Sequence, residues 1–348
     1  MDTVFQILAL VVIVGTFLPV LHRDIWIVRG WDFPQVQLAV TGLLAAVGML
    51  VMDFDGLWWH GTVLVLLGAA MVRLGWVIYP YTPIAKQRVR PGKGETRLRV
   101  IVSNVLMSNR DSAKLLELLE TYEPDLFVAL ETDQWWVDQL AEVAEQYPHA
   151  VELPQDDTYG MLLRSRIPLE GTQVEYLVRK NIPSIHFSIE LKDGTKVKMH
   201  ALHPKPPFPD EDTSSTDRDA ELMIVGKRVK EQGGPAIVFG DMNDVAWSHT
   251  TRLFQRTSGL LDPRMGRGFF STFHAEHWWM RWPLDHLFVS RDFRVCKVER
   301  LAYIGSDHYP IFAEFSYEPE KQVENDPLDG DEGDRREAAK KVAAVRPD

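Results

Sequence analysis

The sequence predicts an α/β domain that follows an all-helical region able to cross a membrane. Long apolar runs fill most of the first 85 residues. From Leu98 onward the pattern changes to short apolar strands that alternate with helices, as in α/β folds. Several of the predicted strands are followed by polar residues, at the positions where open α/β sheets bind ligands. About 220 residues, from 98 to 317, are available for this domain.

Three apolar runs predict transmembrane helices at about 3–21, 36–52 and 57–79, in an anchor that covers residues 1–82. A bilayer core needs about 20 apolar residues in a helix, and only Arg73 brings a charge into these runs. Three buried core helices are an alternative, although soluble helices usually carry a polar face. A cleaved signal peptide is an alternative for the first run, but this run lacks a basic n-region. We therefore expect a retained multi-pass anchor.

Charged residues between the runs predict the orientation of the anchor. Arg23 and Arg29 separate the first two runs, and Asp53 and Asp55 separate the second from the third. Cytoplasmic loops are enriched in Lys and Arg, so the later domain is expected in the cytoplasm, at the inner membrane of a bacterial cell. An outward-facing domain stays open as the alternative. The basic residues after the third run are Lys86, Arg88, Arg90 and Lys93.

Two further segments flank the predicted domain, which spans residues 97–317. Residues 83–96 mix proline and glycine with basic residues, which is typical of a linker. Residues 318–348 are highly charged and lack aromatic side chains. This composition predicts a disordered tail, in which 337–345 could form a short helix.

Overall charge and cysteine content narrow the possible functions. The formal net charge of −11 argues against a general nucleic-acid coat, which needs an excess of basic residues. An enzyme that meets phosphates through a metal ion is still possible, because the metal supplies positive charge. Cys296 is the only cysteine, so the chain cannot form an internal disulfide.

Polar residues at the predicted strand ends carry the chemistry. Taken singly, each has a structural alternative: a turn-forming Asn, a surface carboxylate or a loop histidine. Together they offer oxygen ligands for a hard divalent cation, histidines that exchange protons near neutral pH, and an acid that could orient one histidine. These are the parts of a metal-assisted hydrolysis of a phosphate ester. The residues are Asn104, Glu131, His203, Asp241, Asn243, Asp285, Asp307 and His308.

The order of the motifs around these residues resembles the endonuclease/exonuclease/phosphatase superfamily, which includes pancreatic deoxyribonuclease, exonuclease III-like repair nucleases and neutral sphingomyelinases. The resemblance covers about residues 98–317. The anchor, together with Asp262-Pro263-Arg264 and Gly305 to His308, resembles a membrane-bound bacterial branch of the superfamily. The matching motifs are Ser103-Asn104-Val105, Glu131, Gly160 to Ser165, Leu202-His203-Pro204, Gly240 to Asn243, Leu284 to Phe288 and Ser306-Asp307-His308.

The resemblance implies a four-layer α/β sandwich, in which two mixed β-sheets pack face to face with helices outside. It also implies a metal site. Glu131 is expected to bind Mg²⁺ or Mn²⁺, with Asn104 and Asp307 close to the ion. Asp241 and Asn243 are expected to position the attacking water and the phosphate.

The two histidines take their implied roles from the same resemblance. His308, held by Asp285, is expected to act as a base or to polarise the phosphate. His203 stands where deoxyribonuclease-like members carry a general acid for the leaving oxygen. The sequence departs from the common pattern at Ser103 and Met242, and neither departure removes a metal ligand or a proton donor.

These features predict a membrane-anchored, divalent-metal-dependent phosphodiesterase, most simply of the nuclease type. One alternative is a phosphatase or phospholipase C-like enzyme that acts on lipid headgroups. Another is a catalytically silent membrane module that binds a partner through its acidic tail. The expected partners are a phosphodiester in a nucleic acid or phospholipid headgroup and the bilayer, with no protein partner.

Two groups of residues outside the motifs could take part in substrate binding. Arg164 and Arg218 could meet a substrate phosphate, although an exposed salt bridge would explain either residue equally well. The three tryptophans Trp278, Trp279 and Trp282 could form an aromatic lip beside lipid headgroups, or could simply pack against the domain.

Overall fold

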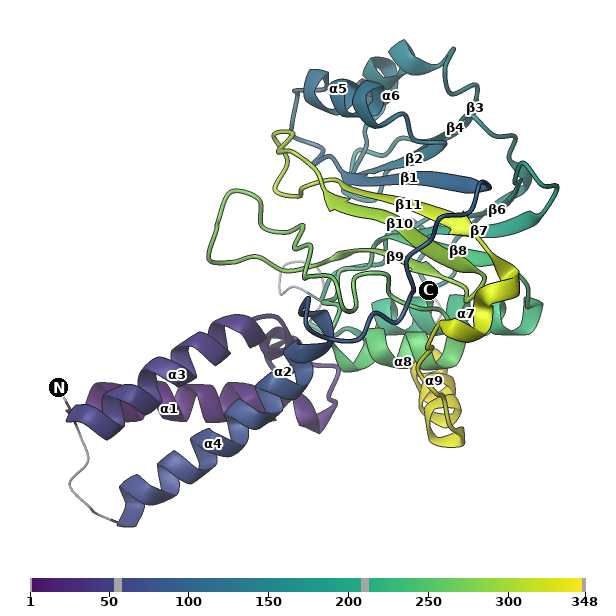
Figure 1. Ribbon diagram of the computed structural model, residues 1–348. Coiled ribbons are helices and arrows are strands. Elements are labelled where there is room, and N and C mark those ends of the chain that lie inside the picture. The colour runs from purple at the N-terminus through teal and green to yellow at the C-terminus, as the bar shows by residue number, and fades with distance from the viewer. Residues whose placement is uncertain (1, 53–57, 208–212, 346–348) are drawn as a thin grey trace.

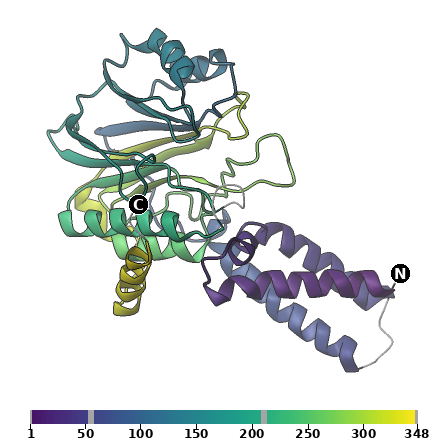
Figure 2. The same ribbon diagram turned by 180° about the vertical axis from the view of Figure 1, so that it is seen from behind.

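The computed structural model describes residues 2–52, 58–207 and 213–345, and it consists of a helical bundle and a layered α/β domain (Figures 1 and 2). Asp53, Asp55 and Leu57, which the sequence places in or beside the second membrane loop, lie outside the described residues.

The α/β domain has four layers, as expected. Two mixed sheets face each other, helices α5 (Ala113–Tyr122) and α6 (Gln134–Leu140) cover one, and α7 (Thr216–Gln232) and α8 (His249–Ser258) cover the other (Figure 1). The first sheet has the order β10 (Phe293–Arg300), β11 (Ile311–Tyr317), β1 (Arg97–Asn104), β2 (Leu126–Leu130), β4 (Met161–Ser165), β3 (His149–Leu153). The second has the order β5 (Glu170–Glu175), β6 (Ser184–Glu190), β7 (Lys196–Leu202), β8 (Ala236–Asp241), β9 (Asp285–Val289).

Side-chain alternation along the strands builds this layered core. Val100 and Val102 of β1 join the core between the sheets, whereas Ile101 points to the other face and packs under the helices. Leu115, Leu118 and Leu119 of α5 recur at helical spacing and are buried against that outer face. The central strands are therefore apolar on both faces, which explains their continuous apolar runs.

The strand directions bring one end of each sheet to a common edge. In each sheet the chain forms one parallel pair, β1 with β2 and β7 with β8, and each pair is joined by a helix. Strand β9 runs antiparallel to β8, so Asp285 at its start pairs directly with Asp241 at the end of β8. Strand β11 likewise runs antiparallel to β1. Residues at the C-terminal ends of β1, β2, β7 and β8 therefore lie close to residues at the N-terminal ends of β9 and β11.

The N-terminal bundle contains helices α1 (Asp2–Phe17), α3 (Gln35–Met52) and α4 (Trp58–Ile78), and small residues such as Ala9, Ala45 and Ala70 are fully buried between them. By length and composition, Val4–Leu21 and Trp58–Tyr81 could cross a membrane. A third span results if Trp26–Asp32 and Gln35–Val51, which meet at 74°, act as one. The two segments contain the short helices α2 (Trp26–Arg29) and η2 (Gly30–Asp32), which follow η1 (Leu18–Leu21).

The connection between α1 and α3 lies beside the α/β domain, while the N-terminus lies at the far end of the bundle (Figure 1). Hydrogen bonds fix the bundle to the domain. Tyr81 of η3 (Tyr79–Tyr81) donates to the Ala246 carbonyl oxygen at 2.5 Å, and Trp247 Nε1 donates to the Asp32 carbonyl oxygen at 2.7 Å. The segment 83–96, expected as a linker, also packs on the domain, since Val89 is buried in the core between the sheets.

The C-terminal segment is folded over residues 318–345, so the prediction of a disordered tail is wrong there. Helix η5 (Pro319–Glu324) is followed by α9 (Glu332–Ala344), which begins with a capping box between Asp331 and Asp334. Ala338 is buried against α7 and α8 in the core under the second sheet. The possible short helix at 337–345 overlaps α9, but composition did not indicate that it docks, because its charges have partners far away in the sequence: His249 bonds Glu337 at 2.6 Å.

Candidate active site

Asn104 links carboxylates from both sheets. Its Nδ2 donates to Glu131 Oε1 at 2.7 Å and to Asp241 Oδ2 at 3.2 Å, while its Oδ1 accepts from the Leu106 amide at 3.1 Å. Asn104 ends β1, Glu131 follows β2, and Asp241 ends β8. The side chains at the common edge therefore face one another across the two sheets, as their places after predicted strands suggested.

The backbone around these carboxylates is closely constrained. Gly240 has φ +139°, and a Cβ there would lie 1.9 Å from the Leu202 carbonyl oxygen, so only glycine lets β7 and β8 close up beside Asp241. Glu131 and Asn243 have φ values of +59° and +49°. A left-handed conformation costs a non-glycine residue about 1–3 kcal/mol and is concentrated at functional sites.

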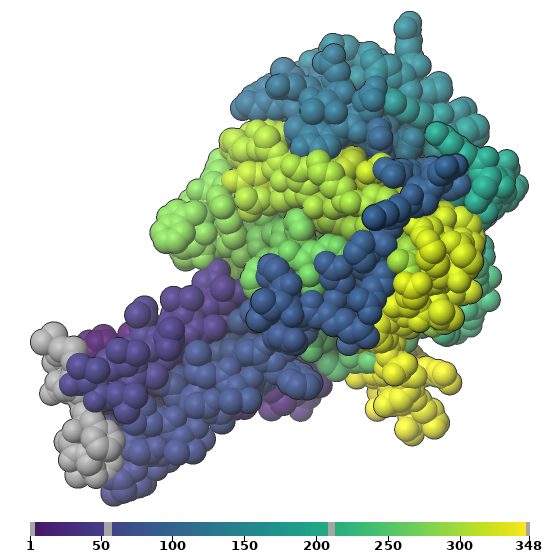
Figure 3. All heavy atoms as spheres, viewed as in Figure 1, coloured from purple at the N-terminus to yellow at the C-terminus, as the bar shows by residue number. Residues whose placement is uncertain are grey.

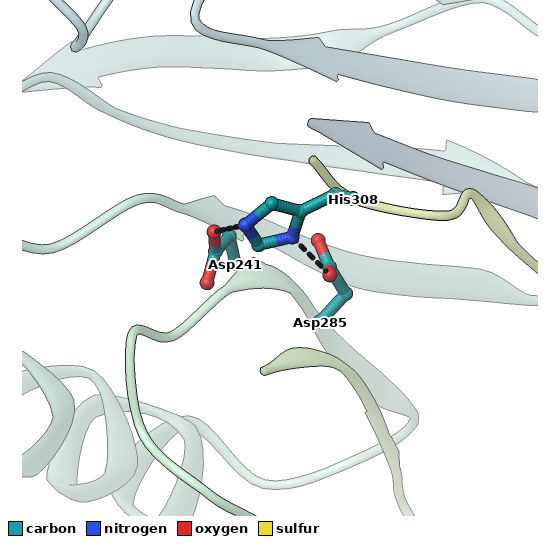
Figure 4. Close-up of side chains that lie close together, drawn as sticks. All are labelled: Asp241, Asp285 and His308. Carbon is teal, nitrogen blue, oxygen red and sulfur yellow. Dashed lines mark hydrogen bonds and ion pairs between the residues drawn. The ribbon is translucent and has the colours of Figure 1, made fainter. Parts of the chain in front are cut away.

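His308 lies between two carboxylates (Figure 4). Its Nδ1 is 2.8 Å from Asp285 Oδ2, and its Nε2 is 3.6 Å from Asp241 Oδ2. His203 approaches the same Asp241 oxygen from β7, with its Nε2 at 4.0 Å. The amide of Asn243 donates to Asp241 Oδ1 at 2.9 Å. Asp241 is thus the acid that both histidines share.

The surroundings set the charge of these groups. Burial raises the pKa of Glu131 to about 7, and the carboxylates of Asp307 and Asp241 add to this effect, whereas Asn104 and His308 oppose it. Burial also raises the pKa of Asp285. Burial alone would lower the pKa of His308, but Asp285 and Asp241 outweigh it and raise this pKa to about 10. His308 is therefore an imidazolium that donates through Nδ1.

The Ser306-Asp307-His308 segment is tied to the same edge. Ser306 Oγ donates to the Asn104 carbonyl oxygen at 2.8 Å, and the His308 amide donates to Ser306 Oγ at 3.0 Å. This position puts the Asp307 carboxylate close enough to raise the pKa of Glu131. The serine therefore fixes the acid and the histidine that follow it.

Among the residues that the structure describes, one compact group has the geometry to hold a metal ion. Asp241, Asp285 and His308 offer ligand atoms within 4.8 Å of one another. A metal could bind the ring of His308 only after the imidazolium lost a proton and a carboxylate contact. The carboxylates of Glu131 and Asp307, which we call the oxygen set, lie beside this group and offer oxygen atoms, which suit a hard divalent cation.

Comparisons with known proteins agree with this geometry. Residues 101–308 match the Endonuclease/Exonuclease/phosphatase family. The chain belongs to this family. Among curated proteins, no sequence matches the chain.

Solved structures share the fold of this family member. An endonuclease/exonuclease/phosphatase from Beutenbergia cavernae DSM 12333 has a TM-score of 0.53 at 17% identity, over 64% of this chain and 72% of that one. D. rerio TDP2 complexed with single-strand DNA product has a TM-score of 0.53 at 17% identity, over 64% of this chain and 100% of that one. The human Nocturnin catalytic domain with a bound sulfate anion has a TM-score of 0.52 at 19% identity, over 64% and 94%.

The two arginines considered as substrate ligands lie outside the family's site. Arg164 is near the opposite end of β4, because β4 runs antiparallel to β2, and its Nη2 donates to Glu152 at 2.5 Å. Arg218 is fully buried beneath the Asp241–Asn243 turn. It donates to the Asn243 carbonyl oxygen at 2.7 Å and to Asp219 at 2.8 Å, so it supports the turn from inside the protein.

Residues outside the predicted set complete the site of this family member. Thr272 Oγ1 accepts from the Asp285 amide at 3.2 Å, and Arg264 Nη1 donates to the Asp285 carbonyl oxygen at 3.1 Å. Phe273 packs on His308 with ring centroids 5.0 Å apart. The Asp262-Pro263-Arg264 motif was a sequence signal for one of these residues, whereas Thr272 and Phe273 carried none.

Proposed function

We propose that the chain is a membrane-anchored phosphodiesterase that depends on Mg²⁺ or Mn²⁺. The observation that carries this proposal is the convergence of Glu131, Asn104 and Asp241 beside the His308–Asp285 pair. The family's hydrolases and the shared fold support a phosphoric ester as substrate. The DNA product bound by TDP2, one structural neighbour, supports a diester.

Each residue has a separate task in the proposed reaction. Glu131 and Asp307 would hold the metal ion with Asn104 beside them, and the bound ion would neutralise charge on a phosphate oxygen. Asp241 accepts the proton of the attacking water. Asn243 helps to hold that water, because its amide ties it to Asp241 and its side chain donates to the Pro204 carbonyl oxygen at 3.0 Å.

The histidines act on the phosphate and the leaving group. His308 is oriented by Asp285 and donates from Nε2 to a phosphate oxygen, where charge develops in the transition state. His203 follows β7 and supplies a proton to the leaving oxygen. Pro204, directly after His203, receives the side-chain hydrogen bond of Asn243, which joins the water-holding and proton-donating parts of the site.

The test uses the full chain purified in detergent and depleted of metal with a chelator. It is offered bis(p-nitrophenyl) phosphate, a single-stranded oligonucleotide and phospholipid vesicles, with Mg²⁺ or Mn²⁺ restored. We expect hydrolysis of at least one diester only when metal is present, and none by Glu131→Ala or His308→Ala. The exposed Lys227→Ala is the control. If no diester is cleaved under any metal condition, the proposal is wrong and the catalytically silent alternative gains support.

We also propose that the catalytic domain faces the cytoplasm of a bacterial cell. Support comes from the basic residues at the domain end of the bundle, including Lys86, Arg88 and Arg90. Reporter fusions placed after Asp348 test this orientation. An enzyme reporter active only in the cytoplasm should work there, whereas activity of a reporter that requires the outer compartment would reverse the assignment.

A further inference from the structure

A short loop carries two tryptophans on the surface between the domain and the bundle. Phe273 and Trp282 pair as an isolated bridge, and the residues between them form what we call the aromatic loop, 274–281. At its tip, Trp278 and Trp279 are 79% and 57% exposed. Burial of a large apolar side chain is favourable, so two adjacent exposed tryptophans indicate a surface that meets another phase or partner.

The tip of the aromatic loop contacts the start of the second long bundle helix. Gln37 Nε2, in the first turn of α3, donates to the Trp279 carbonyl oxygen at 2.8 Å. Figure 3 shows the loop within a green lobe that overhangs the domain end of the purple bundle. The tip is therefore held at a definite level along the bundle axis.

The apolar outer face of α3 begins close to the position of the loop tip along the bundle axis. Val40, Leu43 and Val47 are 56%, 60% and 52% exposed, and they form a row along the helix. Val40 is three residues beyond Gln37, which corresponds to a rise of about 4.5 Å. Tryptophans concentrate at this boundary in membrane proteins, because the ring has an apolar body and a polar N–H.

The other end of the same loop is bonded to the active site. Phe273 pairs with His308 in a second isolated bridge, and the Ala275 amide donates to the Asp307 carbonyl oxygen at 2.6 Å. One segment of about ten residues thus runs from the apolar face of α3 to the groups proposed to bind metal and phosphate.

We propose that the aromatic loop lies in the membrane–water interface beside α3 and presents the active site to phosphodiesters in lipid headgroups of the same membrane. This inference rests on the proposed function. A nucleic acid could also stack on exposed aromatic rings. The headgroup assignment is favoured because the tip lies level with the apolar face of α3, where a bulky polyanion would press against the bilayer, and because the chain has a net charge of −11.

The first test reads the position of the loop without using activity. Cys296 is replaced by serine, and Trp278→Cys is labelled with a polarity-sensitive fluorophore in the full chain, in nanodiscs of phosphatidylethanolamine and phosphatidylglycerol. We expect a blue-shifted emission that is quenched by spin-labelled lipids. The same result is expected when the Glu131→Ala substitution is also present. A label at Lys227→Cys, on the exposed side of α7, serves as the aqueous control. A water-like spectrum at both positions would overturn the proposal even if the enzyme cleaves diesters.

The second test compares substrates. Trp278→Ser combined with Trp279→Ser should raise the KM for headgroup diesters in vesicles about tenfold or more, which corresponds to about 1.4 kcal/mol. Hydrolysis of soluble bis(p-nitrophenyl) phosphate should be unchanged, and Trp278→Phe with Trp279→Phe should restore much of the vesicle activity. The proposal fails if oligonucleotide hydrolysis alone declines, or if all substrates lose activity equally. If neither diester is cleaved even without the substitutions, the proposed function fails and the fluorescence result still decides where the loop lies.

Discussion

Two clusters of buried acids lie on either side of the turn that follows β8, and they differ in how their charge is balanced. The cluster above the turn, which we call the catalytic cluster after its proposed role, consists of Glu131, Asp241, Asp285 and Asp307 with the two histidines. Beneath the turn is a second cluster, the ion network, whose acids contact arginine and lysine. Its members are Asp24, Arg29, Asp32, Arg218, Asp219, Asp244 and Lys341.

The ion network joins four parts of the chain. Lys341 of α9 contacts Asp24 before α2 at 2.9 Å and Asp219 of α7 at 2.8 Å. Arg29 of α2 contacts Asp244 at 3.4 Å, and Asp244 directly follows Asn243 of the candidate site. Arg218, Lys341 and Arg29 outweigh the effect of burial and hold the pKa of Asp219 well below its usual range. The carboxylate of Asp219 is therefore ionised and paired.

The contrast separates a structural cluster from a functional one. In the ion network, four acids contact three permanently charged bases, so the protein itself balances most of the charge. In the catalytic cluster the carboxylates outnumber the histidines, and burial raises the pKa of Glu131 to about 7. An excess of acid in such a cluster is tolerable where a bound cation completes the site.

The largest expected effect is a loss of activity without a loss of stability, from a substitution in the catalytic cluster. Glu131→Ala should lower kcat by about 10³-fold or more, because it removes an acid from the oxygen set proposed to hold the metal that stabilises transition-state charge. Steady-state hydrolysis of the diester cleaved by the unmodified enzyme measures this. The melting temperature should change little, so a parallel loss of folding would show that Glu131 acts in stability instead.

The second largest effect is a loss of stability, from a substitution in the ion network. Arg218→Met leaves Asp219 and Asp244 without one of their buried partners, so the free energy of unfolding should fall by about 3–5 kcal/mol. Activity should fall too, because the Asn243 carbonyl oxygen loses its hydrogen bond. Denaturant unfolding in detergent measures the first quantity.

The matched control for Arg218 is Arg228→Met. Arg228 forms a two-bond pair with the partly exposed Glu175 at 2.7 and 2.8 Å. Such a pair contributes about 0–1 kcal/mol. Equal losses from both substitutions would mean that burial of the ion network has no special weight.

Metal binding should distinguish the two clusters, because the stabilisation by Mg²⁺ should depend on the catalytic cluster and not on the ion network. Saturating Mg²⁺ should stabilise the unmodified protein by about 2.7 kcal/mol when its concentration is 100 times the dissociation constant. The Glu131→Gln variant should lose this stabilisation, whereas Lys341→Met should keep it, because Lys341 belongs to the other cluster. Thermal unfolding with and without metal supplies the readout. A metal response that survives Glu131→Gln would point to the Asp241–Asp285–His308 group as the ligand set.

The smallest effect tests the C-terminal helix. Lys341→Met should lower the free energy of unfolding by about 1–3 kcal/mol, since it leaves the buried Asp219 with one partner fewer. Lys340→Met, on the exposed side of α9, should be neutral. Chemical unfolding of both variants measures the difference, and no difference between them would mean that α9 docks without its ion pairs.

Sequence reasoning was successful where local pattern and strand order decide the outcome. Asn104, Glu131 and Asp241 could be assigned to one edge because each follows a predicted strand, and parallel pairs end together. It was unsuccessful where burial or register decides. Arg218 looked like a phosphate ligand because a basic residue on a helix gives no sign of which way it faces, and Arg164 because the antiparallel direction of β4 was not known.

Long-range pairing explains the remaining errors. Lys341 finds Asp24 across 317 positions in the sequence, so composition alone made residues 318–345 look disordered. The same reason hid the ion network, whose acids and bases come from α2, α7, α9 and the turn after β8. No sequence motif indicates such pairs, because the local sequence around each residue gives no sign of its distant partner.

The position of Lys341 has a consequence for biosynthesis. Helix α9 leaves the ribosome after α2, α7 and the turn after β8 have all been made. Its Lys341 nevertheless contacts Asp24, which precedes the second long bundle helix. Until α9 has been made, Asp24 and Asp219 of the nascent chain therefore lack one counter-charge. The contacts of Lys341 beneath the turn after β8 form only when translation has passed this residue.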